Sequence, residues 1–387
     1  MGETMLSLDN LFALAERESG AYGLADEGLI GRVGKVVDWI NTFGPYSRRE
    51  LLDVQDQVKR LLVNRLKLAF DRQRFPRIAE EKIERPIFVV GFARSGTTLI
   101  HSLLAEDPAA LAPQSWHMYS PSPPPGAGPV VPERIAFSQR QVEHWMDFCP
   151  AQKPMHPYID KGAYQLIEDE ELIALDFRTT YCYHYYKVPH DEILWVDLEP
   201  QGTFDFHRQF MQHGQWNTGK HHWVCKGTLH QGNLKTLFDF YPDALCIWAH
   251  RPISEILSSI TLLGSVIYET ISGKPGDLKA TGKTIAEMMK AGIDGVMADE
   301  MLDDPRLVHI PFPEIVADPL AVIRSVYARQ DREVTPEFES RISAWLDAPE
   351  NKVDRYGRYP YSYEALGLEQ GWVEDLFADY SQRFGLA

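Results

Sequence analysis

The chain is poor in cysteine, and its few cysteines follow no known metal-binding or disulfide pattern. The four are Cys149, Cys182, Cys225 and Cys246; none forms a CxxC pair, and no His/Cys spacing is that of a zinc site. This excludes a disulfide-stapled secreted domain and a zinc-ribbon type of protein. We predict buried thiols in a reducing compartment and no metal ion.

The chain also lacks a long apolar run and any targeting segment. No uninterrupted apolar stretch reaches the ~18 residues that a transmembrane helix needs. Residues 1–10 lack the basic and apolar regions of a signal peptide, and Leu6 stands where N-myristoylation requires Ser or Thr. The sequence therefore predicts a cytoplasmic protein without a transmembrane segment.

Positive charge is in deficit. The sequence has 39 Lys and Arg residues against 55 Asp and Glu residues, which gives a formal net charge of −16. A field of this sign disfavours nucleic acids and anionic membrane surfaces as partners. An anionic small molecule would need a local cluster of basic side chains, so places where basic residues gather are informative.

From residue 86 onward, short apolar runs alternate with amphipathic runs. We predict strands at residues 86–91, 222–226, 244–250 and 307–310. The helices expected after them cover residues 97–106, about 230–240, 252–270 and 285–298, with another through Val322 and Val326. Residues 1–85 and most of 133–216 have helical patterns, whereas residues 113–132 and 272–282 are expected to be loops. Alternating strands and helices predict the α/β class, with a parallel sheet flanked by helices and mostly helical additions.

No linker or internal repeat divides the chain. We therefore predict a single domain over residues 1–387, in which a helical extension of residues 1–85 packs on a core of residues 86–387. With 44% hydrophobic residues, a chain of this length can bury a substantial core.

The sharpest local signal is the run GFARSGTT at residues 91–98, between a predicted strand and a predicted helix. Glycines permit a tight turn, and the backbone N–H groups of such a loop and of the helix start form an anion cradle. Nucleoside triphosphatases have GxxxxGK[ST] here, but Thr97 replaces that lysine and Arg94 places a cation inside the loop. The missing lysine counts against metal-assisted phosphoryl transfer. The predicted anion ligands are Arg94, Ser95, Gly96, Thr97 and Thr98.

A second basic segment is the run HRPISEILSS at residues 250–259. Arg251 follows an apolar strand, and Ser259 lies eight residues later on the next helix. The two side chains can converge on one phosphate group.

Together these segments resemble PAPS-dependent sulfotransferases of the bacterial branch, where PAPS is 3′-phosphoadenosine-5′-phosphosulfate. The first run is similar to the family's PxSGTT loop, with Ala93 in place of proline. The second matches its Arg/Ser pair, although the family often has HRDP instead of HRPI. Residues 223–230, WVCKGTLH, resemble WVLKSPxH, and residues 357–368 resemble GRHxYSLExFGL, so the likeness extends over about residues 86–385.

The resemblance implies a P-loop-like sulfotransferase fold, PAPS as the donor and 3′,5′-ADP as the product. It implies that Arg94 contacts the bridging oxygen and the sulfuryl group, with Lys226 as a second cation on that group. Arg251 and Ser259 would bind the 3′-phosphate, and Arg358 (or Arg355) would lie over the nucleotide. No metal is implied.

Sulfuryl transfer to a hydroxyl group also needs a base that removes the hydroxyl proton. His117 stands where relatives commonly have a glutamate that serves as the base in the tyrosylprotein branch. His230 lies near the position of the catalytic histidine in the cytosolic branch. Both candidates remain open on the sequence.

Aromatic residues indicate the acceptor. Trp116, Tyr119 and Tyr183, the last within the aromatic stretch 181–186, are candidates to line an apolar acceptor cavity, although such residues also form ordinary cores. We expect a small hydrophobic acceptor with a hydroxyl group: an alcohol, phenol, steroid or lipid. The sequence leaves open a homo-oligomeric state and two other functions, a nucleotide kinase and an inactive nucleotide-binding protein.

Overall fold

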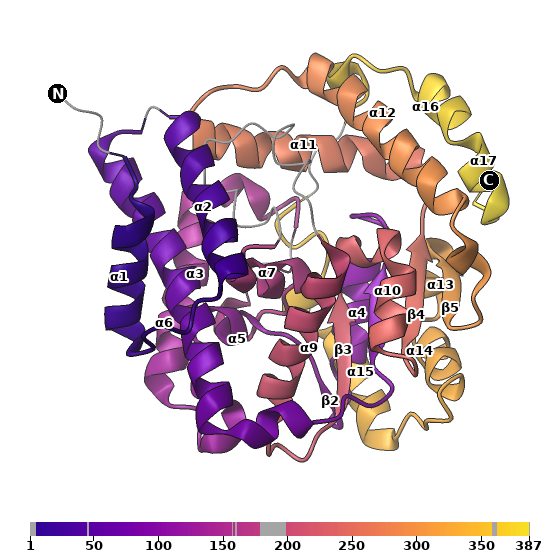
Figure 1. The fold of residues 1–387 in the computed structure, drawn as a ribbon. Coiled ribbons are helices and arrows are strands. Elements are labelled where there is room, and N and C mark those ends of the chain that lie inside the picture. The colour runs from indigo at the N-terminus through magenta and orange to yellow at the C-terminus, as the bar shows by residue number, and fades with distance from the viewer. Residues whose placement is uncertain are drawn as a thin grey trace. The chain divides into compact units, whose positions relative to one another are not determined.

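The computed structural model describes residues 5–44, 46–156, 158, 161–178, 199–357 and 362–386 (Figure 1). Its described residues form two compact units. Unit 1 comprises residues 1–82, 113–141 and 167–220, and unit 2 comprises residues 83–112, 142–166 and 221–387. The single domain predicted from the sequence stays a prediction.

Unit 1 is helical, as residues 1–85 and much of 133–216 were expected to be. Its helices are α1 (Leu8–Ser19), α2 (Glu27–Thr42), α3 (Arg48–Arg74), η1 (Pro76–Glu80), α5 (Ser115–Tyr119), η2 (Pro125–Ala127), α7 (Asp169–Ile173), η5 (Ala174–Asp176) and α9 (Pro200–Gln215), with α6 (Pro132–Phe148) shared between the units. The long helix α3 begins with a capping box, in which Ser47 and Glu50 each bond the other's backbone N–H group. Because the capping box satisfies two of the helix's unpaired N–H groups, it fixes where α3 begins.

A buried carboxylate connects three segments of unit 1. Asp176, whose side chain is 3% exposed, accepts from Arg32 at 2.7 Å, from Arg65 at 2.5 Å and from Arg178 at 2.7 Å. These arginines lie on α2, on α3 and just after η5. A buried charge is tolerated when it is paired in this way, so the cluster ties the helices to one arrangement.

The proline-rich segment 113–132 corrects one expectation. It was predicted to be a loop, but it contains the short helices α5 and η2. At α5 the Gln114 side chain and the His117 ring cap each other's backbone N–H groups, and at η2 proline occupies a first-turn position where its missing N–H costs nothing. His117 therefore lies on a helix.

Unit 2 is built on a parallel sheet, which confirms the predicted α/β class. The strand order is β2-β3-β1-β4-β5, and every neighbouring pair is parallel. The strands are β1 (Ile87–Val90), β2 (Ala110–Leu111), β3 (His222–Lys226), β4 (Leu245–His250) and β5 (Leu307–Pro311). The sequence reading missed β2, because two residues are too few to show a pattern.

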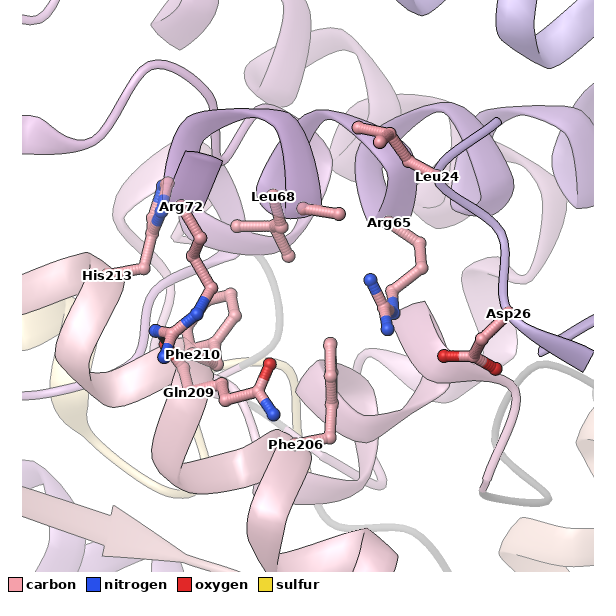
Figure 2. Close-up of a pocket in the computed structure, with 10 residues that line it drawn as sticks. Leu24, Asp26, Arg65, Leu68, Arg72, Phe206, Gln209, Phe210 and His213 are labelled. Carbon is pink, nitrogen blue, oxygen red and sulfur yellow. Dashed lines mark hydrogen bonds between the residues drawn. The ribbon is translucent and has the colours of Figure 1, made fainter. Parts of the chain in front are cut away.

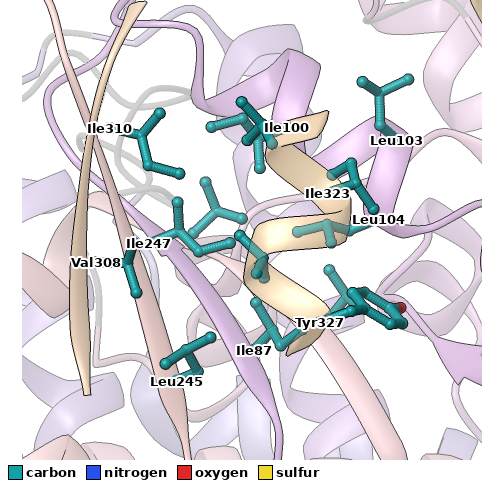
Figure 3. Packing of buried hydrophobic residues seen from close by; sticks show 14 of the residues in the cluster. Ile87, Ile100, Leu103, Leu104, Leu245, Ile247, Val308, Ile310, Ile323 and Tyr327 are labelled. Atoms are coloured by element: carbon teal, nitrogen blue, oxygen red, sulfur yellow. The ribbon is translucent and has the colours of Figure 1, made fainter. Parts of the chain in front are cut away.

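The core of unit 2 gathers on the sheet (Figure 3). All four residues of β1 are fully buried, as expected for a central strand of a parallel sheet covered on both faces. On one face, Ile87, Ile247 and Ile310 pack with Leu103 and Tyr327 from the neighbouring helices α4 (Thr97–Leu104) and α14 (Pro319–Ala328). This packing holds the ends of the strands, and the loops that follow them, in fixed positions.

The remaining helices of unit 2 are η3 (Pro150–Gln152), η4 (Gly162–Tyr164), η7 (Thr228–Gly232), α10 (Leu234–Phe240), α11 (Ile253–Ser272), α12 (Leu278–Met297), η8 (Glu300–Asp303), α13 (Phe312–Ala317), α15 (Pro336–Asp347), η9 (Pro349–Asn351), η10 (Glu364–Leu366), α16 (Gln370–Leu376) and α17 (Ala378–Arg383). Of these helices, two predicted ones are shifted, and α13, α15, α16 and α17 were not predicted. The helix expected from about His230 is divided into η7 and α10. Residues 278–282, expected in a loop, begin α12, because the Asp277 side chain caps the N–H groups of Lys279 and Ala280.

Two expectations from composition can be compared with the structure. Cys149, Cys225 and Cys246 are buried, as predicted, and Cys182 lies outside the described residues. No helix in the described part of the chain combines the length and apolarity needed to cross a bilayer.

Candidate functional site

The loop at residues 91–96 leaves the carboxyl end of β1, the central strand. In open parallel sheets, ligands bind at the carboxyl ends of the strands. The usual place is where the strand order reverses, so that one strand's connection runs to one side and the next connection runs to the other side. Gly96 is the N-cap of α4 with φ of 101°, and α4 has no side-chain cap at this end. A Cβ at Gly96 would lie 2.6 Å from Cδ2 of Phe312, and one at Gly91 would lie 2.8 Å from the carbonyl oxygen of Ala249. Glycine is therefore required at both ends of the loop.

Arg94 lies within this loop in a left-handed conformation, with φ of 71°. A non-glycine residue pays conformational energy there, and such strain gathers at ligand-binding sites. Its Nε donates to Oγ of Ser259 on α11 at 3.0 Å. The Arg94 guanidinium therefore contacts α11, the helix whose Ser259 was predicted from the sequence to bind the second phosphate.

Arg251, at the end of β4, faces the same place. Its Nη1 donates to the carbonyl oxygen of Arg94 at 3.4 Å, and its Nε donates to Oε2 of Glu255 at 2.8 Å. The guanidinium group stacks over the Phe312 ring, 4.6 Å from its centroid, on the residue that also borders Gly96. The two anion-binding segments predicted from the sequence therefore form one contiguous cationic site.

The hydroxyl groups of the loop are used in different ways. Ser95 is 1% exposed and donates to the carbonyl oxygen of Phe92 at 2.7 Å, so it shapes the loop instead of offering a donor outward as we had expected. Thr98 Oγ1 accepts from Nζ of Lys226 at 3.2 Å. Lys226, at the end of β3, is thereby tied to the first turn of α4, and Thr97 is buried in that same turn. The predicted second cation lies beside the loop.

The two predicted bases lie in different units. His230 is in η7 of unit 2, fully buried, with its ring edge-on to Phe88 of β1 at a centroid distance of 5.1 Å. His117 is in α5 of unit 1, where its Nδ1 accepts from the N–H of Gln114 at 3.0 Å. Burial, and then the positive charge of Arg134, lower the pKa of His117 to about 3. The role of either ring as the base stays a prediction.

The predicted acceptor residues are described only in part. Trp116 and Tyr119 are buried in unit 1, where Trp116 Nε1 donates to Oε1 of Gln114 at 2.9 Å and the Arg60 guanidinium lies over the Tyr119 ring. Tyr183 and Arg358 lie outside the described residues.

Unit 1 contains a cavity of about 240 Å³ that the sequence gave no reason to expect (Figure 2). Arg65 and Arg72 face it from α3, and Phe206, Gln209 and His213 face it from α9. None of the residues that the sequence singled out lines it.

The sequence reading missed two residues of unit 2 that interact electrostatically with the site, His156 and Tyr158. The charges of Arg94 and Lys226 both act on His156, and the charge of Arg94 also acts on Tyr158. Burial raises the pKa of the Tyr158 phenol, while Arg94 opposes that shift. The run KPMHPY at residues 153–158 held a usable signal, because two prolines around a histidine interrupt the helical pattern.

Comparisons with known proteins identify the family. The model of the sulfotransferase family matches residues 86–336, more than half of the chain. The crystal structure of sulfotransferase STF9 from Mycobacterium avium aligns with a TM-score of 0.82 and 24% identity, over 100% of this chain and 98% of that chain. Sulfotransferase STF1 from Mycobacterium tuberculosis H37Rv aligns with a TM-score of 0.77 and 22% identity, over 97% of this chain and 100% of that one. A search of the curated proteins finds no match.

At these identities the two solved structures support the fold, and the family model supports membership. The matched range includes the loop at 91–98, Lys226, Arg251 and Ser259, which the geometry brings together at one edge of the sheet. The chain belongs to the sulfotransferase family, whose members are enzymes that transfer a sulfuryl group.

Proposed function

We propose that this sulfotransferase takes its sulfuryl group from PAPS and transfers it to a hydroxyl group of a small hydrophobic acceptor. One observation carries the proposal: Arg94 donates to Ser259, and Arg251 donates to the Arg94 carbonyl, so two cationic segments far apart in sequence adjoin. A donor with anionic groups at two ends fits such a site. Because the net charge of the protein is −16, an anionic donor needs such a local group of cations in order to bind.

The residues present fit this donor. The uncapped start of α4 offers backbone N–H groups to a phosphate, and Arg251 and Ser259 offer donors to a second phosphate. PAPS would supply an activated sulfuryl group on a phosphate leaving group. In the proposed complex Arg94 exchanges its bond with Ser259 for bonds to the donor, which frees the Ser259 hydroxyl for the 3′-phosphate.

Arg94 and Lys226 have the central chemical role in this proposal. Negative charge develops on the leaving phosphate oxygen as its bond to sulfur breaks, and fixed cations stabilise such charge. Lys226 is held beside the loop through Thr98, so its position is set before the substrate arrives. A histidine base takes the acceptor's proton; the sequence named His117 and His230 for this part.

Several further points remain parts of the proposal. The acceptor class rests on Trp116, Tyr119 and Tyr183, of which the first two are buried aromatics of unit 1. A cytoplasmic location, a single domain and an acceptor of low molecular weight stay predictions. So does the nucleotide contact of Arg358.

The test is calorimetric binding of 3′,5′-ADP and of 5′-AMP, which lacks the 3′-phosphate, to the wild type and to Arg251→Met. Loss of charged hydrogen bonds costs about 1.5–3 kcal/mol, so the variant should bind 3′,5′-ADP about 10- to 100-fold more weakly and 5′-AMP almost unchanged. Arg94→Met should weaken both ligands. Arg329→Met, which removes an exposed arginine of the same unit, is the control.

Mass spectrometry of hydroxyl acceptors incubated with PAPS completes the test, because one added sulfuryl group is expected on at least one of them. Equal affinity of the wild type and Arg251→Met for 3′,5′-ADP contradicts the proposed 3′-phosphate site. Transfer from ATP with Mg²⁺ in place of PAPS would favour the kinase alternative.

A further inference from the structure

His156 lies beside the proposed donor site, in a segment held in place by packing. It follows η3 in unit 2, and its backbone N–H donates to the carbonyl oxygen of Gln152 at 2.8 Å. The neighbouring Met155 is fully buried against Leu262 of α11 and Leu366. Because Leu262 is one helical turn from Ser259, this contact places the segment along the helix that carries the donor site.

The electrostatic surroundings of His156 are those of the reaction centre. Among the described residues, the charged groups that act on its ring are Arg94 of the loop and Lys226 of β3. Burial is the largest cause and these two cations the next, and together they lower the pKa of His156 to about 3. The imidazole is therefore neutral at physiological pH, the form that can accept a proton.

The ring also has an unused hydrogen-bonding atom. Nδ1 of His156 is enclosed and has no hydrogen-bond partner among the described residues. Buried polar atoms in proteins nearly always have a partner, so an exception beside a ligand site indicates that the ligand supplies it. The charge of Arg94 also acts on Tyr158, two residues later.

From this geometry we infer that His156 is the general base of the transfer, and that the partner of its Nδ1 is the acceptor's hydroxyl group. The acceptor oxygen forms a bond to sulfur while the bond from sulfur to the 5′-phosphate oxygen breaks. The electron pair of that bond stays on the phosphate oxygen, beside Arg94 and Lys226. The hydroxyl proton moves to Nδ1 and later to water. This inference rests on the proposed function.

The charges of Arg94 and Lys226 also couple the basicity of His156 to the donor. The negative charge of a bound donor offsets Arg94 and Lys226, so the pKa of His156 rises in the complex. The base becomes stronger only when the donor is in place. The charges that act on His117 are those of Arg134 and His213 in unit 1, and the ring of His230 packs on Phe88.

The deciding experiment compares His156→Gln with the wild type on two acceptors, phenol and the more acidic 4-nitrophenol, with PAPS as the donor. Loss of base catalysis lowers kcat by about 10²-fold for phenol, and much less for 4-nitrophenol, which is largely ionised at pH 8. The dissociation constant of 3′,5′-ADP should stay within about twofold, which separates a base from a donor-binding residue. The control is His144→Gln, which removes an exposed histidine of the same unit.

A second measurement does not depend on the acceptor or on the variant's folding. In wild-type protein with labelled histidine, NMR titration should show the His156 ring neutral at pH 6 and its pKa raised by saturating 3′,5′-ADP. If His156→Gln loses the same factor in kcat with both phenols, or loses nothing, the inference is wrong. The proposed function still holds in that case, provided that the wild type transfers the sulfuryl group from PAPS. Absence of turnover together with absence of 3′,5′-ADP binding in the wild type overturns both.

Discussion

At the scale of single residues, the site depends on backbone conformations that only certain side chains permit. Arg94 and Gly96 both have positive φ, and together they turn the loop so that N–H groups, guanidinium and α4 face one point. The glycine is needed sterically and conformationally, whereas Arg94 adopts a strained conformation in a loop that we propose to bind the donor. Strain at a residue with a chemical role is typical of binding loops.

Gly96→Ala tests this reading of the loop. The added Cβ would meet Cδ2 of Phe312 at 2.6 Å at a φ of 101°, so the loop must shift or Phe312 must move away from Arg251. We expect a loss of about 1–3 kcal/mol in the free energy of unfolding and about tenfold or more in affinity for 3′,5′-ADP. Urea denaturation and calorimetry measure the two effects.

The matched control is Gly292→Ala in α12. A Cβ there meets nothing within 4 Å, and alanine is favoured over glycine inside a helix by up to about 1 kcal/mol. This variant should be as stable as the wild type or more so, with unchanged nucleotide affinity. Wild-type affinity in Gly96→Ala would show that the loop does not bind the nucleotide in this conformation.

At the scale of elements, a chain of hydrogen bonds connects the C-terminal helix α17 to β4 and β5. His309 Nε2 donates to the carbonyl oxygen of Leu302 at 2.8 Å, so a neutral His309 presents Nδ1 as an acceptor. His250 Nε2 donates to that Nδ1 at 2.7 Å, and His250 Nδ1 accepts from the Tyr380 hydroxyl at 2.8 Å. All three hydrogen bonds can form when both imidazole rings are neutral. Burial lowers the pKa of His250 to about 2, which keeps its ring neutral.

This chain of hydrogen bonds adjoins both segments of the proposed donor site. His250 precedes Arg251 on β4, and the Tyr380 ring also packs edge-on to Phe92 of the loop at a centroid distance of 6.0 Å. We expect Tyr380→Phe to cost about 1–3 kcal/mol of stability, because Nδ1 of His250 loses its buried donor. The affinity for 3′,5′-ADP should fall about 3- to 10-fold with a smaller change for 5′-AMP.

Tyr268→Phe is the control, since Tyr268 is 42% exposed on α11. Calorimetry on both variants measures the affinities, and denaturation measures the stability. If Tyr380→Phe binds both nucleotides as the wild type does, α17 supports the fold without positioning Arg251.

At the scale of the whole molecule, the sequence predicted best what is local and repeated. Four of the five strands and the helices after them followed from apolar runs and periodicity, and the loop at 91–98 had its cation and glycines in order. The missed parts depend on contacts between distant residues. Nothing in the local sequence predicts that Arg94 bonds Ser259, that the Ser95 hydroxyl turns inward, or that Met155 packs with Leu262 of α11.

The short elements α5 and β2 were also not predictable from the local sequence. Residues 113–132 have the composition of a loop, but reciprocal capping by Gln114 and His117 makes α5 a helix, and such pairs have no strong sequence signature. A two-residue strand such as β2 exists only because β3 is there to pair with it. Tertiary context decides both.

The buried histidines of both units predict how the stability of the whole chain depends on pH. Among the described histidines, burial is the largest cause of a lowered pKa at His309 and at five others: His117 (to about 3), His156 (to about 3), His213 (to about 4), His222 (to about 4) and His250 (to about 2). In the unfolded chain each titrates near about 6.5. Between about pH 6.5 and 4 the unfolded chain therefore binds protons that the folded chain does not.

The free energy of unfolding should accordingly be highest above about pH 6.5 and fall as the pH decreases toward 4. Each histidine contributes on the order of 1.4 kcal/mol per pH unit within this window. Asp71, whose pKa is raised by burial, acts in the opposite direction and reduces the loss. Urea denaturation at pH 7.5, 6 and 5 measures the slope. His222→Gln should lower that slope by one histidine's share, the exposed His144→Gln should leave it unchanged, and a flat profile from pH 7.5 to 5 would mean that these rings are protonated in the folded chain after all.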